Sequence, residues 1–195
     1  LHCDAPTILY ALERQGLGGH PAVRRATAHL VAAARDNGWP CRASAEPGRF
    51  RGPGKKDDPC PYATLIALKA LAAAPSMHDS APAQVGIEML LRHWAERPKW
   101  RPYLFGVGRE FVKIKYPYVW YDILHVTEVL TQFPAARDDP RLREMVTVIG
   151  DKADPEGRYT PESIWMAWKE WDFGQKKRPS PWLTLLVWRL LARLA

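Results

Sequence analysis

The stretch 61–74, with the sequence PYATLIALKALAAA, decides the fold class of this chain. It opens with a proline, which is preorganised for the first turn of a helix and loses no helical hydrogen bond there. Leu65, Leu68 and Leu71 then recur at three-residue steps. Because the stretch is apolar on most sides, we predict a buried inner helix over 61–74.

Segments of the same kind recur along the chain. Counted from Leu9, the similar positions Leu68, Leu124 and Trp188 follow after 59, 56 and 64 residues. Self-similarity at a nearly fixed period is typical of helical repeats. The turns that carry the repeat pair an aromatic residue with a proline: Trp39-Pro40, Trp100-Arg101-Pro102 and Tyr159-Thr160-Pro161. The predicted inner helices cover about 4–15, 61–74, 117–132 and 181–194.

An outer layer of helices is predicted between the inner ones. Pro21, Pro82 and Pro140 each stand where a first helical turn would begin. The charges scattered through the segments that follow suit helices with one exposed face. These outer helices cover about 21–36, 82–96 and 140–152. A further helix is predicted around 161–172, from the helical spacing of Ile164, Trp165, Trp168 and Trp171.

Length and composition indicate a globular protein. With 195 residues, 47% of them apolar, the chain can bury a substantial core in one domain, which we place over 1–195. No apolar run approaches membrane-spanning length and no secretory leader precedes the first helix, although that helix begins abruptly and an upstream segment is expected. Three cysteines, an odd number, favour a reducing cytoplasm over a disulfide framework. The net charge of +7 favours an anionic partner.

Basic residues gather before the inner helices. If these helices are parallel neighbours, the cations meet at one rim, next to helix N-termini that also favour anions. They would then hold a diphosphate or a nucleic-acid backbone. The alternative is a set of solvated loop charges. The residues are Lys55, Lys56, Lys113, Lys115, Lys176, Lys177 and Arg178.

Aromatic residues follow the basic ones directly. Together they would form an electron-rich, apolar pocket below a cationic mouth, suited to an amphiphilic anion or a carbocation. The alternative is that each ring is core packing, since nine tryptophans must be buried somewhere. The residues are Tyr62, Tyr118, Trp120, Tyr121 and Trp182, with Trp165 or Trp168 in addition.

The cysteines and acids supply candidates for chemistry. Cys3, Cys41 and Cys60 are expected near the starts of inner helices, where a mixed zinc site is chemically sensible. No CxxC or HxxxH spacing supports it, and cysteine is often a small buried apolar residue.

Three further residues are candidates for acid–base work. Asp122 and His125 lie three apart, so on one helix they would project from nearby positions. A buried carboxyl such as Asp122 would act as a proton donor, with Asp58 as a second candidate acid. The alternatives are a hydrogen-bonded structural pair at Asp122 and a helix cap at Asp58. Motifs of serine hydrolases, phosphate-binding glycine loops and zinc proteases do not occur.

Two glycine-containing turns resemble the repeats of terpene cyclases and protein prenyltransferases. They are Asp36-Asn37-Gly38-Trp39 and Asp154-Pro155-Glu156-Gly157-Arg158-Tyr159, each ahead of a proline-initiated apolar helix. The resemblance covers nearly the whole chain. It implies an all-α fold, an α/α toroid of inner and outer helices around a central cavity.

The resemblance also sets the expected chemistry. It implies an enzyme or binding protein for an isoprenoid, with a prenyl diphosphate as ligand and, in the prenyltransferases, a zinc ion held by Asp, Cys and His. Asp58, Cys60 and His125 are the residue types available for that zinc. The glutamine usual before the turn is absent, and about three and a half hairpins are present instead of about six, so an incomplete ring is expected.

Two other functions compete with the isoprenoid prediction. A nucleic-acid-binding helical repeat would use the basic loops to follow phosphates. A non-catalytic interaction scaffold would complete its ring with another subunit, which includes a homo-oligomer.

Overall fold

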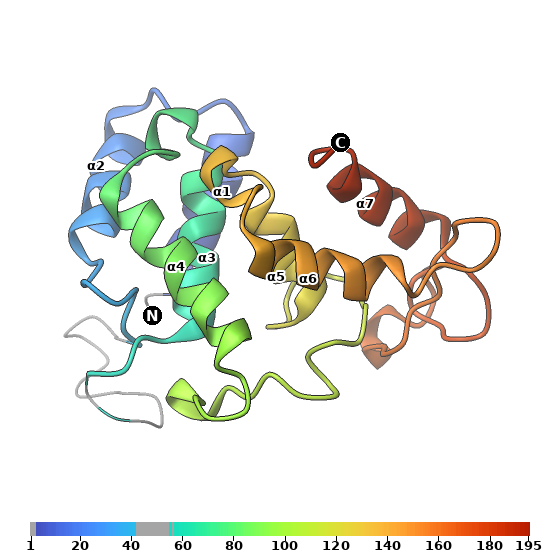
Figure 1. Ribbon diagram of the computed structural model, residues 1–195. Coiled ribbons are helices and arrows are strands. Elements are labelled where there is room, and N and C mark those ends of the chain that lie inside the picture. The colour runs from blue at the N-terminus through green and yellow to red at the C-terminus, as the bar shows by residue number, and fades with distance from the viewer. Residues whose placement is uncertain (1–2, 42–54, 56) are drawn as a thin grey trace. The chain divides into compact units, whose positions relative to one another are not determined.

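The protein is all-helical in the parts of the chain that the structure describes. The computed structural model describes residues 3–41, 55 and 57–195. In these residues the only bridge of strand type joins Arg35 and Gly38. The α-helices are α1 (Asp4–Arg14), α2 (Pro21–Ala32), α3 (Pro61–Ala72), α4 (Ala81–Ala95), α5 (Ile123–Leu130), α6 (Pro140–Gly150) and α7 (Pro181–Leu191) (Figure 1). Short 3₁₀ helices are Pro75–Met77, Pro102–Leu104, Pro134–Ala136 and Met166–Trp168.

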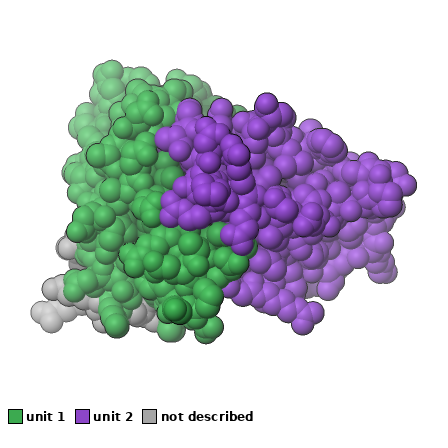
Figure 2. All heavy atoms as spheres, viewed as in Figure 1, with its two compact units in different colours: residues 1–106 green, residues 107–195 purple. Residues whose placement is uncertain are grey.

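The chain divides into two compact units (Figure 2). Unit 1 is Leu1–Gly106 and contains α1 to α4, whereas unit 2 is Val107–Ala195 and contains α5 to α7. No described helix is long and apolar enough to cross a membrane. The all-α class is therefore confirmed, while closure of the helices into a toroid and a single repeat domain stay predictions.

In unit 1, α3 packs against both α1 and α4. The Leu65, Leu68 and Leu71 side chains are fully buried, as their spacing predicts. Trp39 is also fully buried and its indole N–H donates to the Leu30 carbonyl at 2.8 Å, which ties the end of α2 to this core. The core of unit 1 is thus built around the helix that the opening stretch of sequence predicts.

In unit 2, α5 packs against α6 and α7. Every residue of α5 is buried, including Glu128 and His125. The α6 helix contributes Leu142, Met145 and Ile149 to the same core. In each unit a helix predicted as inner therefore packs against one predicted as outer, α3 against α4 and α5 against α6.

The predicted repeat is visible in matching hydrogen bonds. The Trp39 N–H donates to Thr64 Oγ1 at 3.0 Å, and the Tyr159 N–H donates to Thr184 Oγ1 at the same distance. The carbonyl of each aromatic residue accepts from the N–H of the residue that caps the next inner helix. Cys60 donates to Trp39 at 2.7 Å, and Ser180 donates to Tyr159 at 2.9 Å. Residues 25 apart in the sequence are thus joined in the same way in both copies.

The connections from inner to outer helices also match. The N–H of the residue that caps α2, α4 and α6 donates in each case to a carbonyl three residues earlier, at 2.9–3.2 Å. These caps are His20, Ser80 and Asp139, so the copies follow at intervals of 60 and 59 residues. The period of the hydrophobic pattern therefore belongs to a repeated structural unit.

Two of the predicted helices are wrong in extent or type. The helix predicted from 117 begins only at Ile123, because Asp122 caps it and the Ile123 N–H donates to the Phe111 carbonyl at 2.9 Å. The segment 161–172 contains one 3₁₀ turn instead of an α-helix. Its start is held in an extended pairing, since Glu162 N–H donates to the Ile114 carbonyl and Glu162 Oε2 accepts from the Ile114 N–H.

Candidate functional site

The predicted basic residues of unit 2 are divided between internal contacts and open loop. Lys113 pairs with Glu110, and Lys115 is buried, with its Nζ 3.0 Å from the Glu110 carbonyl and 4.9 Å from the centre of the Trp120 ring. Lys176, Lys177 and Arg178 are exposed. Lys55 is exposed in unit 1, and Lys56 lies outside the described residues. A shared cationic rim stays a prediction.

Each predicted aromatic residue of unit 2 contacts another aromatic ring. The Tyr116 ring is the centre of this cluster, with ring centres of Tyr118, Phe173 and Trp182 at 5.2, 4.8 and 5.8 Å. Contacts of this kind are typical of aromatic core packing. Trp120 meets Trp165 at 5.6 Å, Tyr121 meets Phe111 at 5.3 Å, and Tyr62 lies on α3 in unit 1.

Asp122 is a fully buried cap of α5. Its Oδ1 accepts from the His125 N–H at 2.9 Å, and no described residue hydrogen-bonds its buried Oδ2. Burial raises the pKa of Asp122 to about 7, against the opposing effects of the His125 N–H and the Lys115 charge. This carboxyl is therefore a chemically credible proton donor near neutral pH.

The pairing predicted between the Asp122 and His125 side chains takes a different form. Asp122 precedes the helix instead of lying on it, so its carboxylate accepts from the main-chain N–H of His125 and not from the His125 ring. The His125 Nδ1 donates to the Trp120 carbonyl at 2.8 Å, and its ring stacks on Tyr118. Asp58, the second predicted acid, lies in unit 1, where its Oδ2 accepts from the Lys55 N–H at 3.4 Å.

The three cysteines remain thiols in unit 1. Cys60 caps α3, and its Sγ accepts from the Ala63 N–H at 3.4 Å. Burial is the main cause that raises its pKa to about 11, which disfavours the thiolate that zinc binds. Around Cys3, Cys41 and Cys60, as elsewhere in the described chain, no group of three ligand side chains could hold a metal ion. The predicted zinc site gains no support from this geometry.

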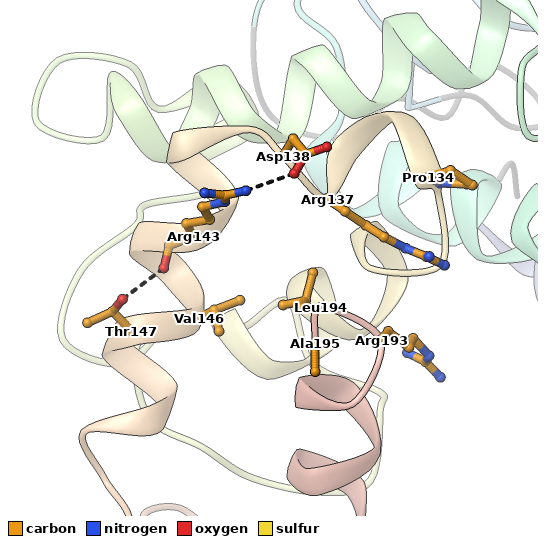
Figure 3. A pocket seen from close by; sticks show the side chains of 9 residues that line it. All are labelled: Pro134, Arg137, Asp138, Arg143, Val146, Thr147, Arg193, Leu194 and Ala195. Atoms are coloured by element: carbon orange, nitrogen blue, oxygen red, sulfur yellow. Dashed lines mark hydrogen bonds and ion pairs between the residues drawn. The ribbon is translucent and has the colours of Figure 1, made fainter.

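A pocket lined by arginines lies in unit 2, at the opposite end of α5 from Asp122 (Figure 3). Its volume is about 590 Å³. Cationic side chains share its wall with apolar ones, a combination suited to an amphiphilic anion. The lining residues of this arginine pocket are Pro134, Arg137, Asp138, Arg143, Val146, Thr147, Arg193, Leu194 and Ala195.

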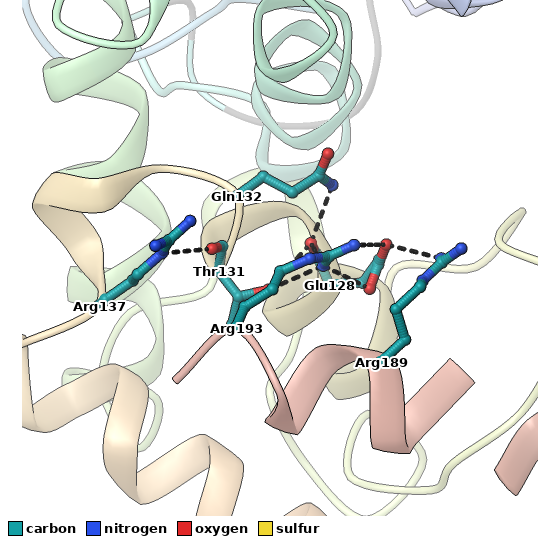
Figure 4. A network of polar contacts seen from close by, with 6 residues as sticks. All are labelled: Glu128, Thr131, Gln132, Arg137, Arg189 and Arg193. Atoms are coloured by element: carbon teal, nitrogen blue, oxygen red, sulfur yellow. Dashed lines mark hydrogen bonds and ion pairs between the residues drawn. The ribbon is translucent and has the colours of Figure 1, made fainter. Parts of the chain in front are cut away.

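A buried carboxylate organises one side of the arginine pocket (Figure 4). The Glu128 side chain is only 7% exposed and accepts from Arg189 at 3.0 Å and from Arg193 at 2.8 and 3.0 Å. Arg193 also donates to Thr131 Oγ1 at 3.1 Å, while the Arg137 Nε donates to the Thr131 carbonyl at 2.9 Å. Two guanidinium groups therefore pair with the Glu128 carboxylate, and a third, that of Arg137, binds the neighbouring Thr131 carbonyl.

The arginine pocket is missing from the sequence-based predictions. The available signal was Glu128, a charge inside the apolar stretch that forms α5, together with Arg189 and Arg193 four residues apart. A buried carboxylate needs compensating cations, and residues four apart share a helix face. The predictions placed cations only at the amino ends of the inner helices and overlooked their carboxyl ends.

Unit 1 has a second pocket, of about 540 Å³, beside the turn that contains Gly38. Most of its charged lining residues are acidic: Asp36, Asp58 and Glu88 against Arg92. It therefore suits a cation better than the anionic ligand predicted from the sequence.

Comparison of the chain with protein-family models, with curated proteins and with solved structures finds no match.

Proposed function

We propose that unit 2 binds an anion with an apolar tail in the arginine pocket. The observation that carries this proposal is the excess of cations over Glu128. One carboxylate offsets one charge of Arg137, Arg189 and Arg193, which leaves a surplus of positive charge around Thr131. Arg137 makes no ion pair with any described residue, so its charge is the one available to a ligand.

The walls of the pocket suit both ends of such a ligand. Guanidinium groups bind carboxylates and phosphates through paired, charge-assisted hydrogen bonds. Pro134, Val146 and Leu194 supply apolar surface beside them. The competing explanation is that the arginines only neutralise Glu128. That explanation accounts for Arg189 and Arg193, which contact the carboxylate, but not for Arg137, which does not.

Within this proposal, an isoprenoid diphosphate is the first ligand to test, because the two glycine-containing turns resemble those of prenyltransferases and terpene cyclases. The test is calorimetric titration with farnesyl diphosphate, with farnesol and with pyrophosphate. We expect the amphiphile to bind more tightly than either the tail or the head group alone. Equal affinity for pyrophosphate would argue against a role for the apolar wall.

Variants locate the binding site. Arg137→Gln should weaken binding about tenfold, the size expected for one lost charge-assisted contact. Arg25→Gln on the exposed side of α2 is the matched control and should change nothing. If Lys176→Gln with Lys177→Gln weakens binding while Arg137→Gln does not, the anion binds at the amino-end loops instead.

Acid catalysis at Asp122 is the second candidate function. It is favoured by the buried Oδ2, which has no partner in the described chain, and by a pKa of about 7. Asp122→Asn keeps the capping oxygen but cannot donate an acidic proton. Incubation of both proteins with a polyprenyl substrate, followed by product analysis, tests this role. Product from the wild type alone supports it, whereas equal product from both proteins overturns it.

Nucleic-acid binding stays the alternative for the exposed basic loop 176–178. It predicts an affinity for oligonucleotides that falls steeply with salt. Retained affinity for farnesyl diphosphate at high salt, with none for oligonucleotides, would separate the two.

A further inference from the structure

Helix α7 exposes a stripe of large apolar side chains. Trp182, Leu185 and Trp188 are 40%, 56% and 53% exposed. Their three-residue spacing places them along one face of the helix. The opposite face is buried through Leu183, Leu186, Val187 and Leu190. We call Trp182, Leu185 and Trp188 the α7 stripe.

Two of these three positions, those of Leu185 and Trp188, are buried in the inner helices α3 and α5. Counted from the capping residue, Leu185 corresponds to Leu65 in α3 and Thr127 in α5, and Trp188 corresponds to Leu68 and Leu130. All four of these counterparts are fully buried. A face that is internal in two copies of the repeat is therefore on the surface in α7.

The structure shows what covers this face in unit 1. A Cβ atom placed on Gly86 of α4 would lie 3.0 Å from the Leu68 side chain, so α4 lies directly against it. The outer helix thus contributes a residue without a side chain at the closest point. In unit 1 the burial of this face is thus completed by the neighbouring helix α4.

We propose that the α7 stripe is a docking surface for an acidic amphipathic helix of a partner protein. Helices bind such surfaces through apolar side chains at helical spacing. The charge around the stripe selects the acidic partner. Lys176, Lys177 and Arg178 are exposed in the loop just before α7. A second copy of this chain, with its net charge of +7, would bring like charges together.

The probe is a fluorescein-labelled peptide of residues 81–95, the sequence of the helix that covers α3. In the acidic probe, Gln84→Glu and Arg92→Glu add charge at positions exposed in α4. In the basic probe, Gln84→Lys and Glu88→Lys do the reverse at equally exposed positions. Fluorescence anisotropy with the whole chain should show that the acidic probe binds about tenfold more tightly than the basic one at low salt.

Variants of Leu185 test the location. Because Leu185 is mostly exposed, Leu185→Gln should leave the circular dichroism spectrum and melting temperature unchanged and weaken binding about tenfold. Leu185→Glu should weaken it further by repelling the acidic probe. Ile8→Gln is the control, because Ile8 is an apolar residue of α1 that is 62% exposed.

Three results would overturn the proposal. The first is no binding of the acidic probe at millimolar concentration, and the second is equal binding by the Leu185 variants. The third is sedimentation showing that the wild type forms dimers that Leu185→Gln abolishes, which would assign the stripe to a second copy.

Discussion

The Asp122 carboxylate accepts a hydrogen bond from the His125 main-chain N–H at 2.9 Å, and this bond defines the start of α5. One carboxylate oxygen therefore has a structural task. The other oxygen is buried without a hydrogen-bond partner in the described chain. The group most suited to proton donation is also a helix cap, so its two roles must be separated by a substitution that affects only one of them.

Asp122→Asn should change the pH dependence of stability while retaining the cap. Because burial raises the pKa of Asp122 from 3.8 to about 7, the folded protein holds a proton that the unfolded chain has lost between these values. The contribution of Asp122 to the free energy of unfolding is thus greatest below pH 3.8 and falls as pH rises to 7. The full change is on the order of 4 kcal/mol. In urea unfolding measured from pH 4 to 8, the free energy of unfolding of the variant relative to the wild type should therefore rise.

Asp139→Asn supplies a control of opposite sign. Asp139 caps α6, but its hydrogen bonds with Arg141 lower the pKa of its carboxyl. Because the pKa is lowered from 3.8, wild-type stability at this site is lost only as pH falls below about 4, so the variant should lose ground as pH rises to 4 and stay level with the wild type from pH 4 to 8. Parallel curves for the Asp122 and Asp139 variants would contradict the assignment.

His93 should remain neutral far into the acid range. It is fully buried, and its Nε2 donates to the Phe105 carbonyl at 3.1 Å. Burial lowers the pKa of His93 from 6.5 to about 4, despite that hydrogen bond. The unfolded chain therefore binds a proton first, and the contribution of His93 to stability falls as pH drops from 6.5 to 4. NMR titration of its ring protons should give a midpoint near 4, whereas a native midpoint near 6.5 would refute this environment.

Glu128→Gln should lower the free energy of unfolding of unit 2, because Arg189 and Arg193 lose the carboxylate that balances their charge. Removing one member of a buried ion pair typically costs about 3–5 kcal/mol. Arg189 is 51% exposed and can turn to water, so we expect about 1–3 kcal/mol. Glu156→Gln removes an exposed partner of Arg158 and should cost much less, because water screens that pair. Equal losses of unfolding free energy for the two variants would mean that the burial of Glu128 does not strengthen its contribution to stability.

The features predicted correctly from the sequence are those that local chemistry determines. Pro61 and Pro181 begin helices as predicted, because a proline at the first turn suits the helix regardless of its neighbours. Pro117 fails as a signal because contacts from elsewhere in the chain fix the segment before α5. The Phe111 carbonyl accepts from Ile123, and the Ile114 N–H donates to Glu162, 48 residues later.

The arginine pocket could not be predicted from the sequence for the same reason: it depends on contacts between distant segments. Glu128 is visible in the sequence as a charge in an apolar helix, but its partners Arg189 and Arg193 lie 61 and 65 residues later. Their meeting depends on the packing of α7 against α5, which no local pattern reports. Lys115 and Trp120 are close in sequence and contact each other, but this contact buries a lysine that the sequence assigns to an anion-binding rim.

The close approach of α4 to α3 gives the last prediction, Gly86→Val. A side chain at Gly86 would meet Trp39 at 2.9 Å and Leu68 at 3.0 Å, and both of these are fully buried and cannot move into solvent. Overpacking of this kind costs about 1–3 kcal/mol, more than the few tenths of a kcal/mol that valine gains over glycine in helix propensity. Gly150→Ala is the matched helical control, since nothing lies within 4 Å of the added Cβ and alanine favours the helix. Calorimetric melting should therefore show a lower transition temperature for Gly86→Val and an unchanged or higher one for Gly150→Ala. Full stability of Gly86→Val would mean that α4 can move away from α3. The close contact of these two helices, from which the docking of a helix on α7 is inferred, would then not be a requirement of the repeat.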